Sequence, residues 1–489
     1  MSDSAVALLG IGSIVAIGSF IGFAARFRRT MDLEQWTVAA RGFGQVLVWL
    51  LMAGEVYTTF TFLGASGWAY SRGGPVLYIL GYQPLMYVVS FFILPPMWEA
   101  GRKYRLQTQA DFFCVRYGSK YLEALVALVG VAFIVPYLQL QLTGLGIIVE
   151  VASFGGIRRT PAMLIAFAIV AAFVFTSGVR GVAWVSVLKD FLLLFAAIFI
   201  GVAIPYHYFG GIGPMFNALA RARPEHLVMP GATKNLGHSW FITTVLMTAC
   251  GFFMWPHYVC ACFTARSGDT LRRNAIVMPL YSITMPLMFF VGFTALLVLP
   301  KLADGDLSLL MLVRKTFPAW FLGIVGGAGA LTAMVPAAIQ ILTAATLFVK
   351  NVCRPILAPS MPDPQVARLA KVTVLFVTGL ALFFAIYSST SLVSLLLLGY
   401  AGVAQFFPGV VLGLFWKRAR AVAVFAGLAS GVAIVAFLML TKRDPYMGWN
   451  SGFIGLCANF AVSVLGSVLT ANSSSGALKI VQETAETPN

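Results

Sequence analysis

The sequence predicts an all-helical integral membrane protein, and three observations lead to that class. Hydrophobic residues make up 60% of the 489 positions and charged residues only 10%, which is more apolar surface than a water-soluble domain can bury. The apolar residues fall in runs of about 18 or more, the length at which a helix crosses a bilayer. These runs lack the regular polar and apolar alternation of membrane β-barrel strands, so the predicted spans are helices.

About thirteen runs are long enough to be spans. They are centred near Val15, Met52, Met86, Phe133, Phe167, Leu193, Met247, Leu287, Met334, Phe376, Leu398, Gly427 and Val462. The first run, from Ala5 to Phe27, is followed by arginines and by no small-residue cleavage site. We therefore expect it to stay in the protein as a helix and not to be removed as a signal peptide.

The basic residues predict the orientation of the chain. Lys and Arg number 33 against 17 Asp and Glu, a formal charge of +16, which in a soluble protein would suggest a nucleic-acid partner. Here the basic residues lie in the links between spans, where they set topology. With the N-terminus outside, roughly 22 of them lie in inner links and roughly 11 in outer links. We expect the N-terminus outside and the C-terminus inside a bacterial-type plasma (inner) membrane.

Two predicted spans are interrupted in the middle. The second contains AGEVYTTFTFLGASGWAY, with Gly54 and the charged Glu55 at mid-membrane depth, and the seventh contains GFFMWPH, with Gly251 and Pro256. The two lie five spans apart, so each would begin one of two five-helix units of opposite orientation. This is the pattern of an inverted-repeat secondary transporter, in which unwound helices expose backbone groups to a central substrate. The alternative is that Gly and Pro are simply common in membrane helices.

The segments around these breaks resemble the sodium:solute symporter family (solute carrier 5-like). The resemblance is carried by ADFFCVRYGS after the third span, by TSGVRGVAWVSVLKD entering the sixth, and by MWPH followed by ARSGDTLRRNA and MPLY, and it extends from Arg41 to Arg420. GEVYTTFTFLGASGWAY together with MWPH and RRNA is most similar to the monocarboxylate permease branch of that family. The resemblance implies a transporter that takes up short organic acids such as lactate or pyruvate by alternating access.

The resemblance also implies a LeuT-like core of five plus five inverted helices, flanked by one helix before and two after. The organisation expected from it is an N-terminal extra helix and link at 1–40, a first repeat at 41–210, an external loop at 211–238, a second repeat at 239–416, two C-terminal helices at 417–472 and a disordered cytoplasmic tail at 473–489.

Sodium coupling, which the family implies, conflicts with several residues of this chain. The family's sodium-binding hydroxyl pair falls on Val335 and Pro336, and its Thr-Asp pair on Val185 and Ser186, with Lys189 one turn deeper. Sodium needs several oxygen ligands, and a nearby lysine repels it. The sequence therefore predicts a degenerate sodium site at Val335, Pro336 and Ser186.

Lys189 and Glu55 are the predicted coupling groups, together with Asp190. A buried amine is costly to keep charged, so Lys189 at the sodium site could take up and release the coupling proton. Alternatively, Lys189 extends to water or pairs with Asp190. Glu55 would repel a carboxylate unless it is protonated, which favours joint binding of proton and anion. Alternatively, Glu55 is structural and accepts hydrogen bonds from Thr58, Thr59 or the broken seventh span.

The substrate is expected between the two breaks. Backbone N-H groups that follow Glu55 would receive a carboxylate, aided by threonine hydroxyls, and aromatic side chains would enclose the apolar part. The predicted binding residues are Gly54, Glu55, Thr58, Thr59, Phe252, Trp255, Tyr400 and Gln405. Each could instead serve only in packing, and His257 could titrate or be a hydrogen-bonded structural residue.

Other functions remain as alternatives. A sodium symporter for an amino acid or other small solute could hold its ion mostly through backbone carbonyls near Gly54 and Ala333. A transporter-like sensor or a membrane enzyme is a different class, but the four histidines form no metal-spaced or nucleophile motif. We therefore expect no enzyme activity, no cofactor and no metal, with H⁺ as the coupling ion, a small organic acid and the lipid bilayer as partners, and function as a monomer.

Overall fold

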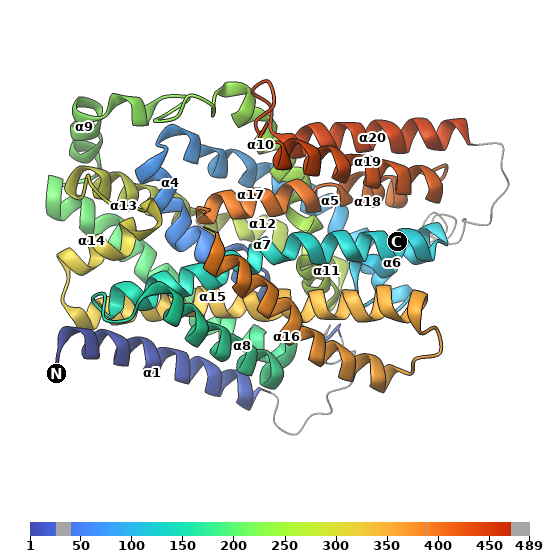
Figure 1. Cartoon of the computed structure of the whole chain (residues 1–489), viewed down its shortest axis with the longest axis horizontal. Coiled ribbons are helices and arrows are strands. Elements are labelled where there is room, and N and C mark those ends of the chain that lie inside the picture. Colours follow the sequence, from blue (N-terminus) through green and yellow to red (C-terminus); the bar gives the residue numbers. More distant parts are fainter. Residues whose placement is uncertain (26–40, 389, 471–489) are drawn as a thin grey trace.

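The computed structural model describes residues 1–25, 41–388 and 390–470, and these fold almost entirely into helices (Figure 1). Within these ranges the extended backbone pairs only at two isolated bridges, Phe43 with Ala265 and Tyr446 with Trp449. The predicted tail at 473–489 and most of the predicted link within 1–40 lie outside the described residues.

The first half of the chain contains the first broken helix. Its elements are α1 (Asp3–Ala24), α3 (Gln45–Val56), η2 (Phe60–Gly64), α4 (Ala65–Ser71), η3 (Gly74–Leu77), α5 (Tyr78–Lys103), α6 (Gln109–Tyr117), α7 (Lys120–Ala152), α8 (Arg159–Phe209), α9 (Ile212–Ala222) and η4 (Pro224–Leu227). The η2 segment is a π-helix, a form that often marks functional sites.

The second half contains two further bent helix pairs. Its elements are α10 (His238–Gly251), η5 (Phe252–Met254), α11 (Pro256–Phe263), α12 (Gly268–Val277), η6 (Met278–Ile283), α13 (Thr284–Val298), η7 (Gly305–Leu307), α14 (Ser308–Thr316), α15 (Ala319–Phe348), η8 (Val349–Leu357), α16 (Asp363–Tyr387), α17 (Leu392–Val403), α18 (Phe406–Phe415), α19 (Ala421–Leu440) and α20 (Ser451–Leu469).

The described helices account for nine to twelve membrane spans. Nine are long and apolar enough by themselves, and three bent pairs bring the number to twelve. The shorter apolar helix Arg159–Val174 corresponds to the remaining predicted span. It is continuous with the rest of α8, yet both ends of α8 contact the same short segment, because Arg159 pairs with Asp304 and Tyr208 bonds to Thr316. The chain therefore reverses direction within α8.

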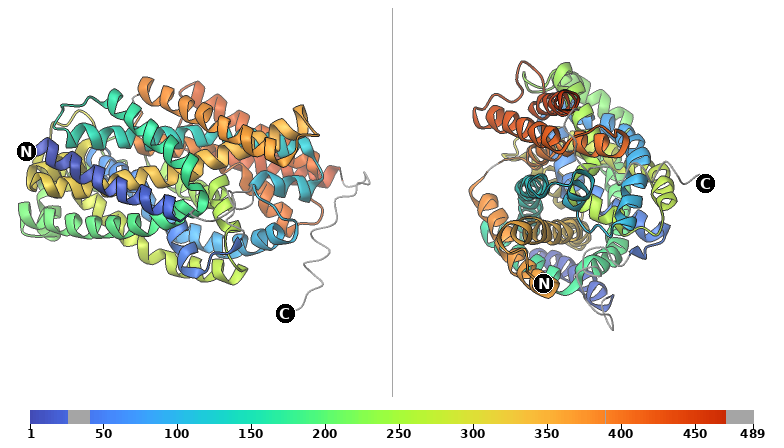
Figure 2. Two further views of the ribbon diagram at one scale, coloured as in Figure 1. Left: turned by 90° about the horizontal axis from the view of Figure 1, so that it is seen from below. Right: turned by 90° about the vertical axis from the view of Figure 1, so that its right-hand side faces the viewer.

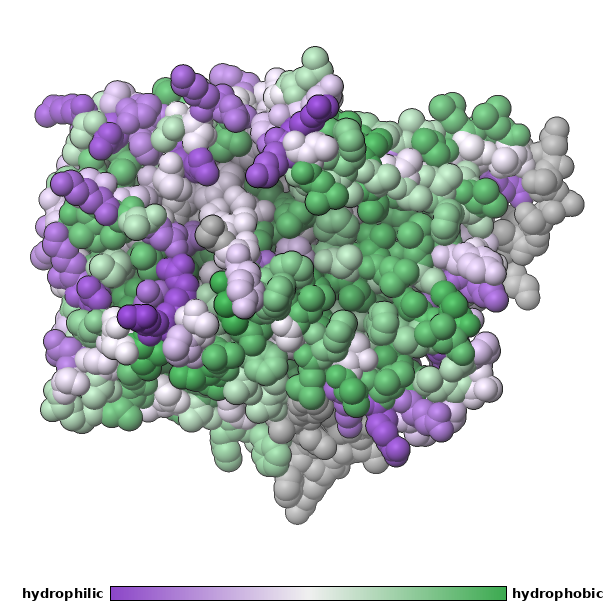
Figure 3. All heavy atoms as spheres, viewed as in Figure 1, coloured by the Kyte–Doolittle hydropathy of each residue, from purple (hydrophilic) through white to green (hydrophobic). Residues whose placement is uncertain are grey.

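The helices run roughly along the long axis of the molecule, so the bundle has two distinct ends (Figures 1 and 2). We call the end where α1 begins, which also holds α9 and α14, the N end. The opposite end, which holds α6 and the end of α18, is the C end. Hydrophobic side chains cover the middle of the face in Figure 3, and hydrophilic ones gather toward the ends. This distribution is that of a chain embedded in a bilayer.

The broken helices lie inside the bundle. The pair of α3 and η2–α4 bends by 52°, and the pair of α10–η5 and α11 bends by 47°. Helix α3 packs against α8, α11 and α15, so the first break faces α8 on one side and the second broken helix on another. Buried backbone that leaves a helix must find partners within the protein. At the first break, side chains from neighbouring helices are those partners.

Candidate functional site

The first break is a short extended segment between α3 and η2. The helix ends when Tyr57 adopts φ −100° and ψ 90°. The hydroxyl of Thr58 then accepts a hydrogen bond from the Phe60 N-H at 3.3 Å, which stabilises the restart of the helix. The carbonyl groups before the break are thus free to face neighbouring helices.

Lys189 of α8 fills the space beside this break. Its ammonium group donates to the Gly54 carbonyl at 2.6 Å and to the Tyr57 carbonyl at 2.9 Å, and lies 3.0 Å from Asp190 Oδ1. Both charged side chains are completely buried. Asp190 also accepts from the Tyr281 hydroxyl at 3.4 Å. The ammonium is therefore held by three oxygens in a site that excludes water.

Gly54 is required for this approach of α8. A Cβ atom at Gly54 would lie 2.8 Å from Ser186 Oγ and 3.4 Å from Lys189 Nζ, and the first of these distances is a steric clash. Ser186 itself donates to the Val182 carbonyl at 3.0 Å. The absence of a side chain at Gly54 lets the two helices meet closely enough for Lys189 to reach the carbonyls.

The second break brings His257 opposite Glu55. The backbone leaves the helical region at Trp255, with ψ 130°, and Pro256 begins α11, because proline suits a first helical position. His257 Nε2 lies 3.9 Å from Glu55 Oε2, and both side chains are fully buried. Among the described residues, no group hydrogen-bonds to either Glu55 carboxyl oxygen or to either His257 ring nitrogen. The two Glu55 carboxyl oxygens and the two His257 ring nitrogens are thus buried without a hydrogen-bond partner among the described residues.

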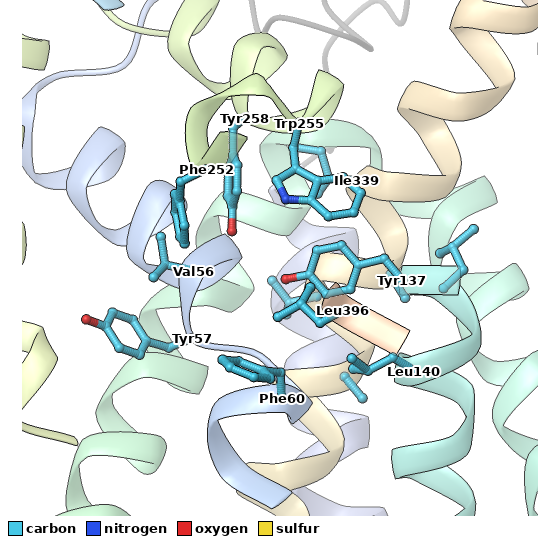
Figure 4. Packing of buried hydrophobic residues seen from close by; sticks show 14 of the residues in the cluster. Val56, Tyr57, Phe60, Tyr137, Leu140, Phe252, Trp255, Tyr258, Ile339 and Leu396 are labelled. Atoms are coloured by element: carbon cyan, nitrogen blue, oxygen red, sulfur yellow. The ribbon is translucent and has the colours of Figure 1, made fainter. Parts of the chain in front are cut away.

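The backbone of Glu55 is held in place although its side chain is not. The Tyr258 hydroxyl donates to the Glu55 carbonyl at 2.6 Å, and the Tyr137 hydroxyl lies 3.5 Å from the same oxygen. Figure 4 shows both tyrosines directed toward the break in the first helix. Hydroxyl groups from α7 and α11 therefore hold the backbone at the break. The carboxyl group of Glu55 takes no part in these bonds.

Aromatic rings surround this pair. Phe252 stacks on Tyr258 with ring centroids 5.3 Å apart, and Trp255 lies 4.8 Å from Tyr137 (Figure 4). Trp255 also lies 5.4 Å from Tyr400. Gly399 of α17 provides space for the indole ring, since a Cβ there would lie 2.4 Å from Trp255 Cη2. We call Glu55, His257 and these rings the central site.

The other residues predicted from sequence take different positions. Thr59 donates to Gln141 Oε1 of α7 at 2.7 Å. Gln405 donates to Gly452 at 3.1 Å and lies beside Asn459 of α20, so it joins α17 and α18 to a C-terminal helix. The degenerate-sodium-site residues Val335, Pro336 and Ser186 are fully buried in α15 and α8. The central site thus includes Glu55, Phe252, Trp255 and Tyr400, with Gln405 placed apart from it.

Sequence reasoning did not select Tyr137, Tyr258 or Tyr281, whose hydroxyl groups hold the two sites. Tyr258 could have been noticed, because it follows the second break directly. Tyr137 and Tyr281 carry no comparable signal in the sequence. Within the described ranges, no group of three or more His, Cys, Asp or Glu side chains is arranged to hold a metal ion.

The family model and the similar proteins all indicate the same family of membrane transporters. The model of the sodium:solute symporter family matches residues 36–431. An uncharacterized symporter, YhjB of Bacillus subtilis strain 168, is 42% identical, with 96% of this chain and 98% of the relative covered. A monocarboxylate transport permease protein of Rhizobium johnstonii is 28% identical, with 93% and 94% covered.

The fold also matches a solved structure. A Na⁺-coupled sialic acid symporter in a substrate-bound outward-open state superimposes with a TM-score of 0.79 at 16% identity, over 96% of this chain and 99% of that one. At this identity the match concerns the fold, which is LeuT-like. With the family match, the apolar helices and the bacterial relatives, it identifies the chain as a multi-pass bacterial membrane transporter of the sodium:solute symporter family.

Proposed function

We propose that this transporter imports small monocarboxylates such as lactate or pyruvate, and that protons rather than sodium drive the uptake. The proposal of a proton as the coupling ion rests on the position of Lys189, whose ammonium group donates hydrogen bonds to the carbonyl oxygens of Gly54 and Tyr57. The substrate class draws on the similarity to the Rhizobium permease and on the small, aromatic-walled central site.

The oxygens available near Lys189 do not favour sodium. A sodium ion prefers several hard oxygen ligands. The Gly54 and Tyr57 carbonyls and Asp190 already bind the ammonium group, and the Ser186 hydroxyl bonds to its own helix. A sodium ion would have to displace a covalently attached cation from this site. When Lys189 is protonated, its own ammonium group is the cation at these oxygens. Exchange of a proton on this amine requires no sodium ion at the site.

The buried charges explain why an anion would need a proton. Glu55, Lys189 and Asp190 are the charged groups around the break, and they sum to −1 when all three are ionised. A carboxylate entering alone would raise the negative charge in a low-dielectric region, at high cost. If a proton binds Glu55 at the same step, the charge stays at −1. Protonated Glu55 and the His257 imidazole could then both donate hydrogen bonds to the carboxylate.

The orientation that fits uptake puts the N end outside and the C end inside. Helix α6, η8 and the connection after α18 carry basic residues at the C end, among them Arg116, Lys350 and Lys417. Basic residues in short links are retained on the cytoplasmic side. The substrate would then reach the central site from the N end and leave beside α6 and α11.

The test is uptake of labelled lactate or pyruvate into proteoliposomes. An inward pH gradient and an inward sodium gradient at fixed pH are applied in parallel, with protein-free liposomes as the control for passive diffusion of the neutral acid. Accumulation with the pH gradient alone supports the proposal. Accumulation only with sodium contradicts proton coupling, and no protein-dependent uptake under either gradient contradicts the substrate class.

A further inference from the structure

A cavity of about 640 Å³ opens at the N end, beside the outer ends of the broken helices. Its walls come from the end of α4, the segment before α10, the start of α17 and the connection between α19 and α20. We call it the N-end basin. The end of α4 and the start of α10 both line it, so it lies at the N end of both broken helices.

The basin has an excess of positive charge. Arg72, Lys234 and Lys442 line it, and Asp444 is its one acidic residue. Asp444 is already engaged, because it accepts hydrogen bonds from the backbone and side chain of Ser451. In the described ranges of the chain, none of the three cations forms an ion pair with an acid. Three cations and one carboxylate give the basin a net charge of +2, and a pocket with this excess attracts anions.

A neighbouring cavity of about 550 Å³ provides the comparison. It also reaches Arg72, but its other charged residues are Arg159, Asp304 and Asp306. Arg159 pairs with Asp304 at 3.0 Å, so this second cavity has as many acidic as basic residues, unlike the basin. Arg72 lies at the junction of the two cavities and is only half-buried. It is therefore the cation best placed to contact a small anion before the anion moves inward.

Aromatic rings connect the basin to the central site. Trp68 and Trp240 line the basin with their rings 6.0 Å apart. Tyr78 contacts Trp240 at 5.7 Å and Tyr82 at 5.7 Å, and Tyr82 lies 5.8 Å from Phe252. Phe252 belongs to the central site. The ring contacts thus run without a gap from the basin to the central site, and such rings suit a carboxylate with a short apolar body.

We propose that the N-end basin is a first binding site for the substrate carboxylate, with Arg72 as its anion-binding residue. The proposal rests on the proposed function for the identity of the anion, but it concerns a second site with a different chemistry. The basin binds by charge in a place open to water, whereas the central site binds a proton and a carboxylate together. Arg72 would raise the local concentration of substrate and affect the KM rather than the turnover.

Kinetic analysis of Arg72→Gln in proteoliposomes is the first test. We expect the KM for lactate to rise on the order of fivefold to tenfold with little change in Vmax, because a screened charge contact is lost. Arg72→Lys should restore much of the affinity. Arg158→Gln is the matched control, since Arg158 is exposed near the start of α8 and does not line the basin. An equal rise in the control, or a loss of Vmax alone in Arg72→Gln, overturns the proposal.

A binding measurement separates this proposal from the proposed function. Thr390 lines both cavities, so a cysteine in place of Thr390 reports on the basin through its rate of maleimide labelling. Lactate should slow the labelling, and Arg72→Gln should remove that protection. The same protection is expected when Lys189→Gln is added to stop proton-coupled transport. Absence of Arg72-dependent protection overturns the basin even if lactate is transported, and protection without uptake retains the basin while contradicting the proposed function.

Discussion

The two ionisable sites at the first break differ in how their buried charges are satisfied. The Lys189 ammonium has three oxygen partners within 3.0 Å. Glu55 is the next residue after Gly54, yet its carboxyl oxygens receive no hydrogen bond from the described residues, and His257 remains 3.9 Å away. A saturated site holds its cation in place, while an unsaturated pair of polar groups is costly unless something binds there. The difference supports the proposal that Lys189 holds the cation at the break and that Glu55 takes part in substrate binding.

The largest effect is expected from Lys189→Gln. The amide is neutral and cannot carry a proton, and the Gly54 and Tyr57 carbonyls and Asp190 would lose their cation. We expect pH-driven accumulation of lactate to fall on the order of 100-fold, since a buried charge left alone is strongly destabilising. The measurement is initial uptake under an inward pH gradient in proteoliposomes.

The same variant also tests whether the Lys189 ammonium group keeps sodium away from its three oxygen partners. With the ammonium removed, three oxygens are free for a small cation, so sodium should stimulate the remaining uptake of Lys189→Gln more than that of the unaltered protein. If Lys189→Gln takes up lactate under a pH gradient as fast as the unaltered protein does, the lysine has only a structural role. Circular dichroism and size-exclusion profiles of the purified variant exclude a folding defect as the cause.

Glu55→Gln is expected to separate coupling from binding. The glutamine keeps a hydrogen-bond donor beside His257 but cannot release a proton. Net accumulation under a pH gradient should fall about tenfold or more, whereas exchange of internal for external lactate should continue, because exchange needs no net proton movement. Loss of both activities would mean that Glu55 stabilises the break and does not take part in coupling.

The positions of the breaks and of Lys189 could be predicted from the sequence. Glycine, proline and a lone charge inside apolar runs are local signals, so Gly54, Glu55 and Pro256 stand out. The placement of Lys189 near the sodium site came from the family resemblance, and the structure gives it contacts with backbone carbonyls and with Asp190.

The partners of these residues could not be predicted. Tyr137 and Tyr258 bond to the same carbonyl from helices about 80 and 200 residues distant in sequence, and no local pattern records such a meeting. Gln405 was expected near the substrate, but its amide bonds to Gly452 of α20. A buried amide in a membrane helix signals that a partner exists and does not indicate which helix supplies it.

Gly54→Ala should weaken the Lys189 site through shape alone. The new methyl group would lie 2.8 Å from Ser186 Oγ, so α3 and α8 must separate and the bonds from Lys189 lengthen. We expect uptake to fall about fivefold, in line with the cost of overpacking. Adding Ser186→Gly removes the clashing group, so the double variant should recover most of the activity. Failure of this rescue would show that Gly54 is needed for backbone freedom and not for close approach.

The smallest effect is expected from a change at Asp306, which concerns access to the central site from the N end. Asp306 in η7 accepts the N-H of Leu392 at the start of α17, at 2.9 Å, and a Cβ at Gly67 of α4 would contact its carboxyl group. Asp306 thus joins η7, α17 and α4, and we expect these elements to separate when the N end opens. Burial raises the pKa of Asp306 to about 7, with Asp304 raising it further, while the Leu392 N-H and Arg159 oppose the shift.

The sign of the resulting pH dependence follows from linkage. An open N end would hydrate Asp306 and return its pKa to about 4, so the closed form binds the proton more tightly. Closure is therefore favoured at low pH, and opening becomes easier as the pH rises from about 4 to about 7. Asp306→Asn cannot ionise and should remove this dependence. Labelling of a cysteine in place of Thr390, expressed as the ratio of the Asp306 form to the Asp306→Asn form, should rise between pH 5 and 8. The ratio cancels the ionisation of the thiol itself, so a flat ratio would leave proton control of transport with Lys189 and Glu55 alone.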